Sequence, residues 1–301
     1  MKAGTANVLT MNALRAAMLV GIVALTACTE SFDLTLNYQT KSTPTEALVI
    51  DNAAGSVRLR RTGAGGAISG TVKIHASGFD KASQARAAAE QVEIGERING
   101  GELVLTVEIP QAQRNKFFVV TFDLWVPDNL IVSSITDTGR VSINGLTVAE
   151  VDTTLGEVAL AFTSSPAGKA TVVRTSDGLV TLDSHEGDVD IATTNAPLEL
   201  FSVAGNVRAS TTQGDITARL VPPPGGEVFL STTNAPIDLS VPREFGARLL
   251  AVTSAPGAVF ISSDLIFRPS NSFPDQAEGT LGNGAGRVDV RTTGADIAIH
   301  R

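Results

Sequence analysis

The sequence predicts an all-β protein, an elongated β-solenoid or β-roll of stacked short strands with one short covering helix. Between residues 177 and 220 a small residue recurs every nine positions, and apolar residues follow each one at the second and fourth positions. Aromatic residues make up only 5% of the chain although 43% of it is hydrophobic, so we expect a core of small aliphatic side chains. Such a core suits thin stacked strands. The recurring small residues are Gly178, Gly187, Ala196, Gly205 and Gly214.

Each repeat unit reads as a turn followed by a strand that alternates between apolar and polar residues. A strand of about five residues is not stable alone, but stacking many of them buries a continuous apolar stripe. Two units per turn would give a coil of about 18 residues that adds about 4.8 Å to the stack. The alternation places Val189, Ile191, Leu198, Leu200, Val207 and Ile216 inside the stack and Asp188, Asp190, Glu199, Arg208 and Asp215 in water.

The first 28 residues have the pattern of a targeting sequence. An apolar run from residue 16 to residue 25 follows basic residues and is too short to span a bilayer, as in a secretory signal. The end of this segment resembles the lipobox of bacterial lipoproteins, with Leu25, Thr26, Ala27 and Cys28 in sequence. That resemblance implies a lipoprotein signal peptide over residues 1–28, cleavage before Cys28 and a lipid on its sulfur. The alternative is an ordinary signal peptide with a cysteine there by chance.

A lipid on Cys28 would hold the protein on a membrane of the cell envelope. Thr29 follows the cysteine where some lipoproteins have an aspartate. By resemblance to known sorting signals, this favours the outer membrane in a bacterium with two membranes.

Residues 29–131 are expected to form an N-terminal β region with one helix. The stretch 55–59 is one more copy of the repeat unit. Residues 81–94 are rich in good helix formers, contain neither glycine nor proline, and follow Asp80 as a candidate N-cap. The most aromatic strand, residues 117–126, ends at Pro127. We expect this region to form the base of the stack, with the helix covering an end or a face.

Residues 132–301 are expected to continue the stack as β-solenoid repeats with two interruptions. Residues 221–226 contain three prolines, which remove ladder donors, so this stretch should leave the sheet. Residues 266–276 form a longer polar insertion that carries Phe267 and Phe273. A loop of this kind is a candidate binding site for a glycan or protein ligand, and a solvated insert without function is the alternative.

Charge and residue usage bear on several functional classes. The net charge of −8 and the lack of basic clusters argue against nucleic acid as a partner. His75, His185 and His300 lie far apart, and none has a cysteine or second histidine at metal-ligand spacing. His185, beside Asp183 and Glu186, is expected to be a surface turn residue, although it could join a carboxylate in acid–base chemistry.

A carbohydrate-active β-helix enzyme is the catalytic alternative. Such enzymes need two or three carboxylates on one face. Candidates for that face are Asp183, Asp188, Asp190, Glu199 and Asp215, although their alternation with small polar residues is also typical of a solvated surface. Residues 282–289 loosely match a calcium-binding nonapeptide, and this match occurs only once in the sequence.

The serial Ser/Thr-x-x-Gly-x-Ile/Val units resemble the putative-adhesin β-roll family, also labelled DUF4097. The early unit at 55–59, the edge at 125–127 and the terminal segment 281–299 carry the same likeness, which spans residue 48 to the C-terminus. The resemblance implies an all-β, solenoid-like fold with no established catalytic residues. Where alanine and proline replace the anchoring glycine, the turns should change shape while the register holds.

Together, the patterns and the resemblance favour an envelope-anchored lipoprotein with an adhesin-like β-solenoid. It would act in surface interaction or as a structural scaffold, without catalysis, metal or cofactor. Its expected partners are a membrane, through the lipid on Cys28, and a glycan or protein ligand on the solenoid surface or the 266–276 loop. The alternatives are the β-helix polysaccharide lyase or hydrolase and a periplasm-facing sensory or scaffold module.

Overall fold

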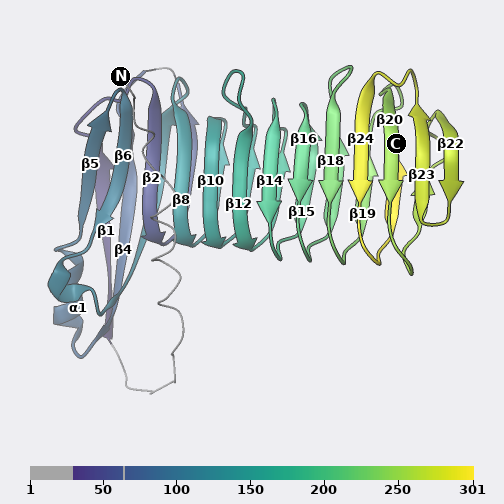
Figure 1. The fold of residues 1–301 in the computed structure, drawn as a ribbon. Coiled ribbons are helices and arrows are strands. Elements are labelled where there is room, and N and C mark those ends of the chain that lie inside the picture. The colour runs from purple at the N-terminus through teal and green to yellow at the C-terminus, as the bar shows by residue number, and fades with distance from the viewer. Residues whose placement is uncertain (1–29, 64) are drawn as a thin grey trace, which may run out of the picture.

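The computed structural model describes residues 30–63 and 65–301, and within them two β-sheets face each other along an elongated stack (Figure 1). Successive strands lie side by side across the long axis, and the chain alternates between the sheets. One strand from each sheet makes one coil. The side chains between the sheets form one continuous core that runs from Leu48 near one end to Ile299 near the other.

Sheet A contains twelve of the described strands, in the spatial order β1-β4-β7-β3-β9-β11-β13-β15-β17-β19-β25-β21. Its strands are β1 (Glu30–Gln39), β3 (Val57–Thr62), β4 (Ser69–Phe79), β7 (Phe117–Pro127), β9 (Val141–Asn144), β11 (Val158–Ala161), β13 (Val180–Asp183), β15 (Leu198–Val203), β17 (Ile216–Leu220), β19 (Ile237–Ser240), β21 (Val259–Ile261) and β25 (Ile297–His300).

Sheet B contains the other thirteen described strands, in the spatial order β22-β23-β20-β24-β18-β16-β14-β12-β10-β8-β2-β6-β5. Its strands are β2 (Ala47–Ala54), β5 (Glu93–Asn99), β6 (Glu102–Glu108), β8 (Ile131–Thr138), β10 (Thr147–Leu155), β12 (Thr171–Asp177), β14 (Val189–Thr193), β16 (Val207–Ser210), β18 (Glu227–Ser231), β20 (Ala247–Val252), β22 (Phe267–Phe273), β23 (Gln276–Leu281) and β24 (Gly286–Arg291).

The coils stack in register, as the nine-residue repeat predicts. In sheet A, Val180 pairs with Leu198 and Leu198 with Ile216, while Val189 pairs with Val207 in sheet B. Each of these steps is 18 residues, or two repeat units per coil. The prediction of an all-β solenoid of stacked short strands is therefore confirmed.

The predicted division between inward and outward residues is also confirmed. Each of the six aliphatic side chains assigned to the interior is at most 2% exposed. Asp188, Arg208 and Asp215 are exposed, and Asp190 and Glu199 are partly exposed. A one-residue slip would bury these charges, so burial of the aliphatic row fixes the register.

Glycines allow successive coils to lie in contact at their corners. A Cβ atom on Gly156 would lie 2.0 Å from the carbonyl oxygen of Gly139 in the preceding coil, and one on Gly178 would lie 2.3 Å from that of Gly156. At the opposite corner, a Cβ on Gly205 would lie 2.0 Å from the carbonyl oxygen of Gly187. The anchors nine residues apart therefore alternate between two corner columns. Alanine at residues 196 and 235 leaves the strand register unchanged.

Buried threonines that directly follow strands β16, β18 and β24 of sheet B bind the backbone of the neighbouring corner. Thr211 Oγ1 donates to the carbonyl oxygen of Ala196 at 3.1 Å, and Thr232 Oγ1 donates to that of Gly214 at 3.2 Å. Thr292 repeats the contact with Ala235 at 2.8 Å. The hydroxyls satisfy corner carbonyls that the strands leave without a partner, so the turn residues are linked from coil to coil.

At both ends of the stack, the order of the strands in space differs from their order in the sequence. β2 lies between β6 and β8, and β3 lies between β7 and β9, so β1 and the chain between β3 and β8 form the outer layer at one end. At the other end β24 lies between β18 and β20, and β25 lies between β19 and β21. The last two strands of the chain are therefore inserted inside the stack rather than added to its tip (Figure 1).

The predicted helix is present but shorter than residues 81–94. α1 (Ala82–Ala89) has Lys81 at its N-cap position, without a side-chain hydrogen bond, so the expectation that Asp80 caps it is wrong. Ala85, Ala88 and Ala89 are buried as the helix packs on β1 and β4. The segment from Glu93 onward instead pairs with β6 as the edge strand β5, because backbone hydrogen bonds in a sheet outweigh its helix propensity.

Residues 266–276 are not the loop that the sequence suggests. Most of the stretch belongs to β22 and β23, which form an antiparallel hairpin at the end of sheet B. Phe267 packs against the core, whereas Phe273 is 57% exposed. The hairpin covers the open edge of β20 and so ends the sheet. The proline-rich stretch 221–226 lies outside the strands, as predicted.

Candidate functional site

The candidate site lies at the corner where strands of sheet A end and the chain turns toward sheet B. Gly145, Phe162, Ser184 and Ser202 occupy this corner in four successive coils, and all have a left-handed backbone, with φ of 73°, 52°, 56° and 54°. The backbone N–H of each of the first three donates to a strand carbonyl of the next coil, at 3.0, 2.9 and 2.9 Å. The corner residues are therefore stacked in register.

Phe162 is an unusual residue for this conformation. A left-handed backbone brings the Cβ of a bulky residue close to its own carbonyl, so such residues are rare there. The Phe162 ring is also 66% exposed, so burial does not offset the strain. A strained residue whose side chain stays in water is a candidate for function.

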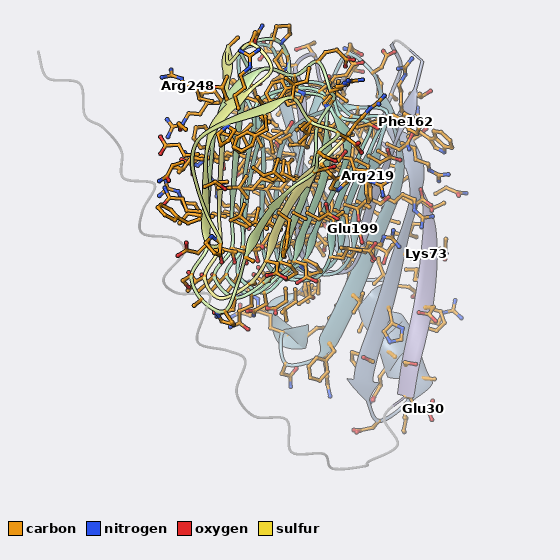
Figure 2. The ribbon with its side chains drawn as sticks, turned by 90° about the vertical axis from the view of Figure 1, so that its right-hand side faces the viewer. Glu30, Lys73, Phe162, Glu199, Arg219 and Arg248 are labelled. Atoms are coloured by element: carbon orange, nitrogen blue, oxygen red, sulfur yellow. The ribbon has the colours of Figure 1, made fainter. Side chains whose placement is uncertain are left out.

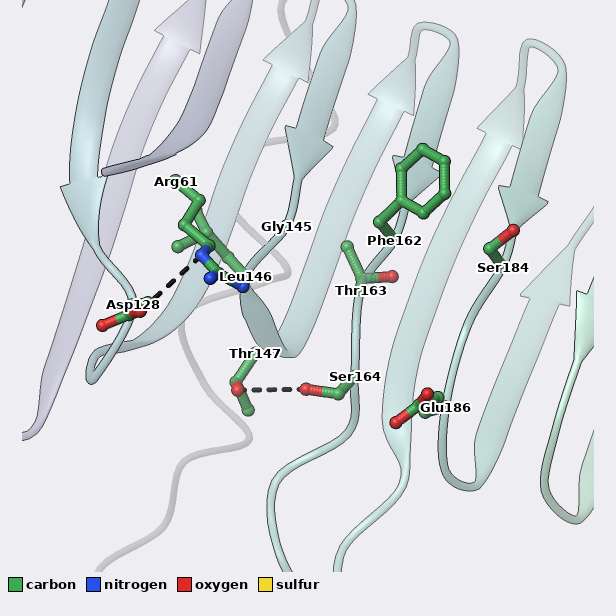
Figure 3. Close-up of a pocket in the computed structure, with 10 residues that line it drawn as sticks. All are labelled: Arg61, Asp128, Gly145, Leu146, Thr147, Phe162, Thr163, Ser164, Ser184 and Glu186. Carbon is green, nitrogen blue, oxygen red and sulfur yellow. Dashed lines mark hydrogen bonds and ion pairs between the residues drawn. The ribbon is translucent and has the colours of Figure 1, made fainter. Parts of the chain in front are cut away.

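A groove of about 430 Å³ runs along this corner (Figure 3). At one end, Arg61 Nε lies 3.6 Å from Asp128 Oδ2. The Thr147 and Ser164 hydroxyl oxygens are 3.1 Å apart along one wall. The full lining is Arg61, Asp128, Gly145, Leu146, Thr147, Phe162, Thr163, Ser164, Ser184 and Glu186.

The composition of the groove suits binding better than bond cleavage. An exposed aromatic ring offers an apolar surface, and the neighbouring hydroxyls and charges offer donors and acceptors for a polar ligand. Glu186 is the one acid at its end of the groove, and Asp128 is paired with Arg61 at the other. The arrangement suits a molecule with an apolar face and hydroxyl groups at its rim, such as a sugar ring.

His185 lies directly beside the groove and is fully buried, so the expectation of a surface turn histidine is wrong. Its Nδ1 is 2.9 Å from Thr163 Oγ1 and its Nε2 is 3.0 Å from Ser165 Oγ. Both partners come from the preceding coil, at sequence separations of 22 and 20 residues. Only the stacking brings them together, so no local sequence signal marks this burial.

The His185 network is structural rather than nucleophilic. Ser165 Oγ donates to the carbonyl oxygen of Asp188 at 2.6 Å and accepts the backbone N–H of Thr171 at 3.2 Å. Its proton is therefore not directed at His185, and in the described residues no carboxylate hydrogen-bonds the imidazole. Burial lowers the pKa of His185 to about 4, so the ring is neutral at pH 7.

The structure does not gather the five candidate acids on one face. Asp190 lies on sheet B, whereas Asp183 and Glu199 lie on sheet A; Figure 2 shows Glu199 beside Arg219, on the side of the stack away from Arg248. Asp188 accepts hydrogen bonds from the backbone and side chain of Asn206 at 2.9 and 3.0 Å. Parallel pairing repeats one face every 18 residues, so acids nine residues apart alternate between the sheets.

The other candidate ligands are also separated. His75 Nδ1 contacts Asp33 at 2.7 Å, while His300 lies near the opposite end of sheet A. Asp289 belongs to residues 282–289, the stretch that loosely matches a calcium-binding nonapeptide. It accepts hydrogen bonds from Arg291 Nε at 2.6 Å and from Arg287 Nη2 at 3.1 Å. Burial would raise the pKa of Asp289, but the two guanidinium groups lower it below its usual range. Residues 30–63 and 65–301 hold no cluster of three metal-ligating side chains.

The lipobox residues and Cys28 lie outside the described residues. In the part of the chain that the structure describes, no helix is long and apolar enough to cross a membrane.

Comparison with known proteins gives one family match. A family model described as Toastrack DUF4097 matches residues 45–300. No curated protein matches the chain.

Several solved structures resemble the fold at low identity. A putative adhesin from Bacteroides fragilis is 14% identical, with 89% of this chain and 97% of that chain covered at a TM-score of 0.40. A putative cell adhesion protein from Clostridium sporogenes is 11% identical, with 89% and 99% covered at a TM-score of 0.29. A putative adhesin from Parabacteroides merdae is 10% identical, with 88% and 95% covered at a TM-score of 0.29.

The buried His185 should make the stability depend on pH. Its folded-state pKa of about 4 lies below the ordinary 6.5, so the unfolded chain binds more protons between these pH values. Stability is therefore full above pH 6.5 and falls by roughly 3 kcal/mol as the pH is lowered toward 4. Denaturant unfolding at pH 7.5 and 4.5 should show that His185→Gln loses less stability on acidification than the wild type. Equal losses in the two proteins would contradict the assignment.

Proposed function

The chain belongs to the Toastrack DUF4097 family, and from that premise we propose that it is a non-catalytic protein of the bacterial cell envelope. Its β-solenoid acts in surface interaction, in the manner of an adhesin, or as a structural scaffold. The observation that carries the interaction role is the corner groove, where the exposed ring of Phe162 lies beside hydroxyl and charged side chains.

The rigidity of the groove supports a binding role. Its walls are stacked strand ends, joined by backbone hydrogen bonds and by a ladder of isolated bridges from Thr147 to Ser164 and from Ser164 to Glu186. The His185 network fixes the layer beneath. A ligand that enters such a site pays little to order it, so modest contacts can yield useful affinity. The candidate acids are distributed over both sheets, which gives the enzyme alternative no geometric support.

Anchoring through a lipid on Cys28 fits the position of the first strand. β1 begins at Glu30, so a single residue would separate the lipid-bearing cysteine from the folded body. Glu30 pairs with Phe79 at the far end of the antiparallel extension of sheet A (Figure 2). Phe117, which pairs with Ser77 at the same end, is 65% exposed. The protein would stand on its membrane at this end, with Phe117 near the lipid surface.

Cys28→Ser should release the protein from membranes. Stable anchoring needs two or three acyl chains, and all of them depend on this cysteine in the lipoprotein pathway. After cell fractionation, we expect wild type in the membrane fraction, soluble only with detergent, and the variant in the soluble fraction. Thr29→Ser, next to the cysteine, should behave as wild type. A wild-type protein that is soluble without detergent would refute the anchoring proposal.

Phe162→Ala should weaken ligand binding without unfolding the protein. The ring is exposed, so its removal takes away contact surface for a ligand but little buried area. On a glycan array, we expect the wild-type signal to fall at least about fivefold in the variant, since loss of an aromatic anchor typically costs more than about 1 kcal/mol. Phe260→Ala is the matched control, because Phe260 is 56% exposed on a different coil. Equal binding by Phe162→Ala and wild type would exclude the groove as the site.

A further inference from the structure

A row of arginines crosses the outer face of sheet B near the end closed by the hairpin. Arg268 on β22 pairs with Thr280 on β23, Thr280 pairs with Arg248 on β20, and Arg248 pairs with Arg287 on β24. Side chains of paired residues project to the same face of a sheet. Leu249 and Val288, the next residues along, are buried, so the row faces water. Figure 2 shows Arg248 directed away from the stack.

The row concentrates positive charge in an acidic chain. Arg248 and Arg287 are direct partners on neighbouring strands, and like charges in that position repel. Arg287 is offset by Asp289, at 3.1 Å, and by Glu227, its strand partner on β18. Within residues 30–63 and 65–301, neither Arg248 nor Arg268 has an acidic group within ion-pair distance. The whole chain has a net charge of −8, so the positive charge of the arginine row is a local feature of the surface.

The row borders a hollow that can receive an anionic group. A groove of about 340 Å³ lies between β24, β20 and the hairpin, and Arg248, Arg287, Ser270 and Thr280 line it. Arg287 is held in place, because its guanidinium lies 5.0 Å from the centre of the Phe229 ring and also donates to Asp289. Glu278, on the groove wall, offsets part of the charge. The Arg287 guanidinium is thus preorganised, and the neighbouring Arg248 guanidinium can bind an anionic group.

We propose that this arginine row binds the carboxylate or sulfate groups of an acidic polysaccharide, which gives the ligand class for the surface interaction proposed above. A guanidinium forms paired hydrogen bonds with carboxylate or sulfate oxygens. Neighbouring strands are about 4.8 Å apart, so Arg248 and Arg287 lie one strand spacing apart and Arg268 lies two spacings from Arg248. A linear polymer with repeated anionic groups can contact charges placed in this way across the strands. The acidity of the whole chain disfavours nucleic acid, because binding its closely spaced phosphates typically takes an extended basic surface.

The test measures binding of the full mature protein in detergent to immobilised polymers. The probes are polygalacturonate, dextran sulfate, uncharged dextran and single-stranded DNA, at low and at physiological salt. We expect the wild type to bind one or both acidic polysaccharides, more weakly at higher salt, and not to bind dextran. The double variant Arg248→Gln/Arg268→Gln should lose at least about tenfold in affinity, because charge-assisted hydrogen bonds are lost.

Arg208→Gln is the control, since it removes one positive charge from the same sheet two strands away from the row. Its effect is compared with that of the single variant Arg248→Gln as well as with that of the double variant. It should change affinity less than about threefold, because a surface charge outside the site contributes little. No binding of either acidic polysaccharide, equal losses in the double and control variants, or tighter binding of DNA would each overturn the assignment. These outcomes are distinct from loss of membrane association, which bears on the anchoring proposal alone.

Discussion

Successive coils touch at their corners, and the rest of the structure depends on that contact. At Gly156 and Gly205 a Cβ would lie 2.0 Å from a carbonyl oxygen of the preceding coil, so the close approach at these two corners requires a residue without a side chain. Other corners accept a methyl group, since Ala196 and Ala235 keep the strand register. The strands are too short to be stable alone, and they share their core with the coils above and below. Threonine hydroxyls then bind the corner carbonyls, which links each turn to the next. Corner spacing, strand pairing and the buried aliphatic row are therefore one cooperative unit.

In-register stacking also assembles the two candidate binding surfaces from distant residues. The corner groove joins Arg61 to Glu186 because equivalent turn positions of consecutive coils lie above one another. The arginine row joins Arg248, Arg268 and Arg287 because the hairpin and the inserted strand β24 flank β20. Neither surface has a contiguous motif. A fold of this kind can change what it binds by changing outward residues one coil at a time, while the inward row and the corners stay the same.

The sequence predicts the repeated strands, but it does not predict how the strands are ordered at the two ends of the stack. The nine-residue period predicts the strands around Val189 and Leu198 and their inward side chains, because a period-2 alternation has one register that keeps charges in water. It does not predict that β24 and β25 enter the stack ahead of β20 and β21, since every copy of the repeat can pair with every other. It also misses the edge strand β5 and the buried His185, whose surroundings come from neighbouring strands or coils rather than from adjacent residues. The sequence does not predict the arginine row either, because its residues come from three strands that only the fold brings together.

The most direct test of the corner contact compares the stability of Gly156→Ala with that of Gly63→Ala by denaturant unfolding. Gly156 lies outside the left-handed region, so alanine adds only the steric overlap with Gly139, whereas a Cβ on Gly63 would meet no atom within 4 Å. We expect Gly156→Ala to lose roughly 2 to 3 kcal/mol of unfolding free energy, as overpacked sites do. Gly63→Ala should stay within about 0.5 kcal/mol of the wild type. Equal stability of the two variants would contradict the claim that corner contact sets the stack.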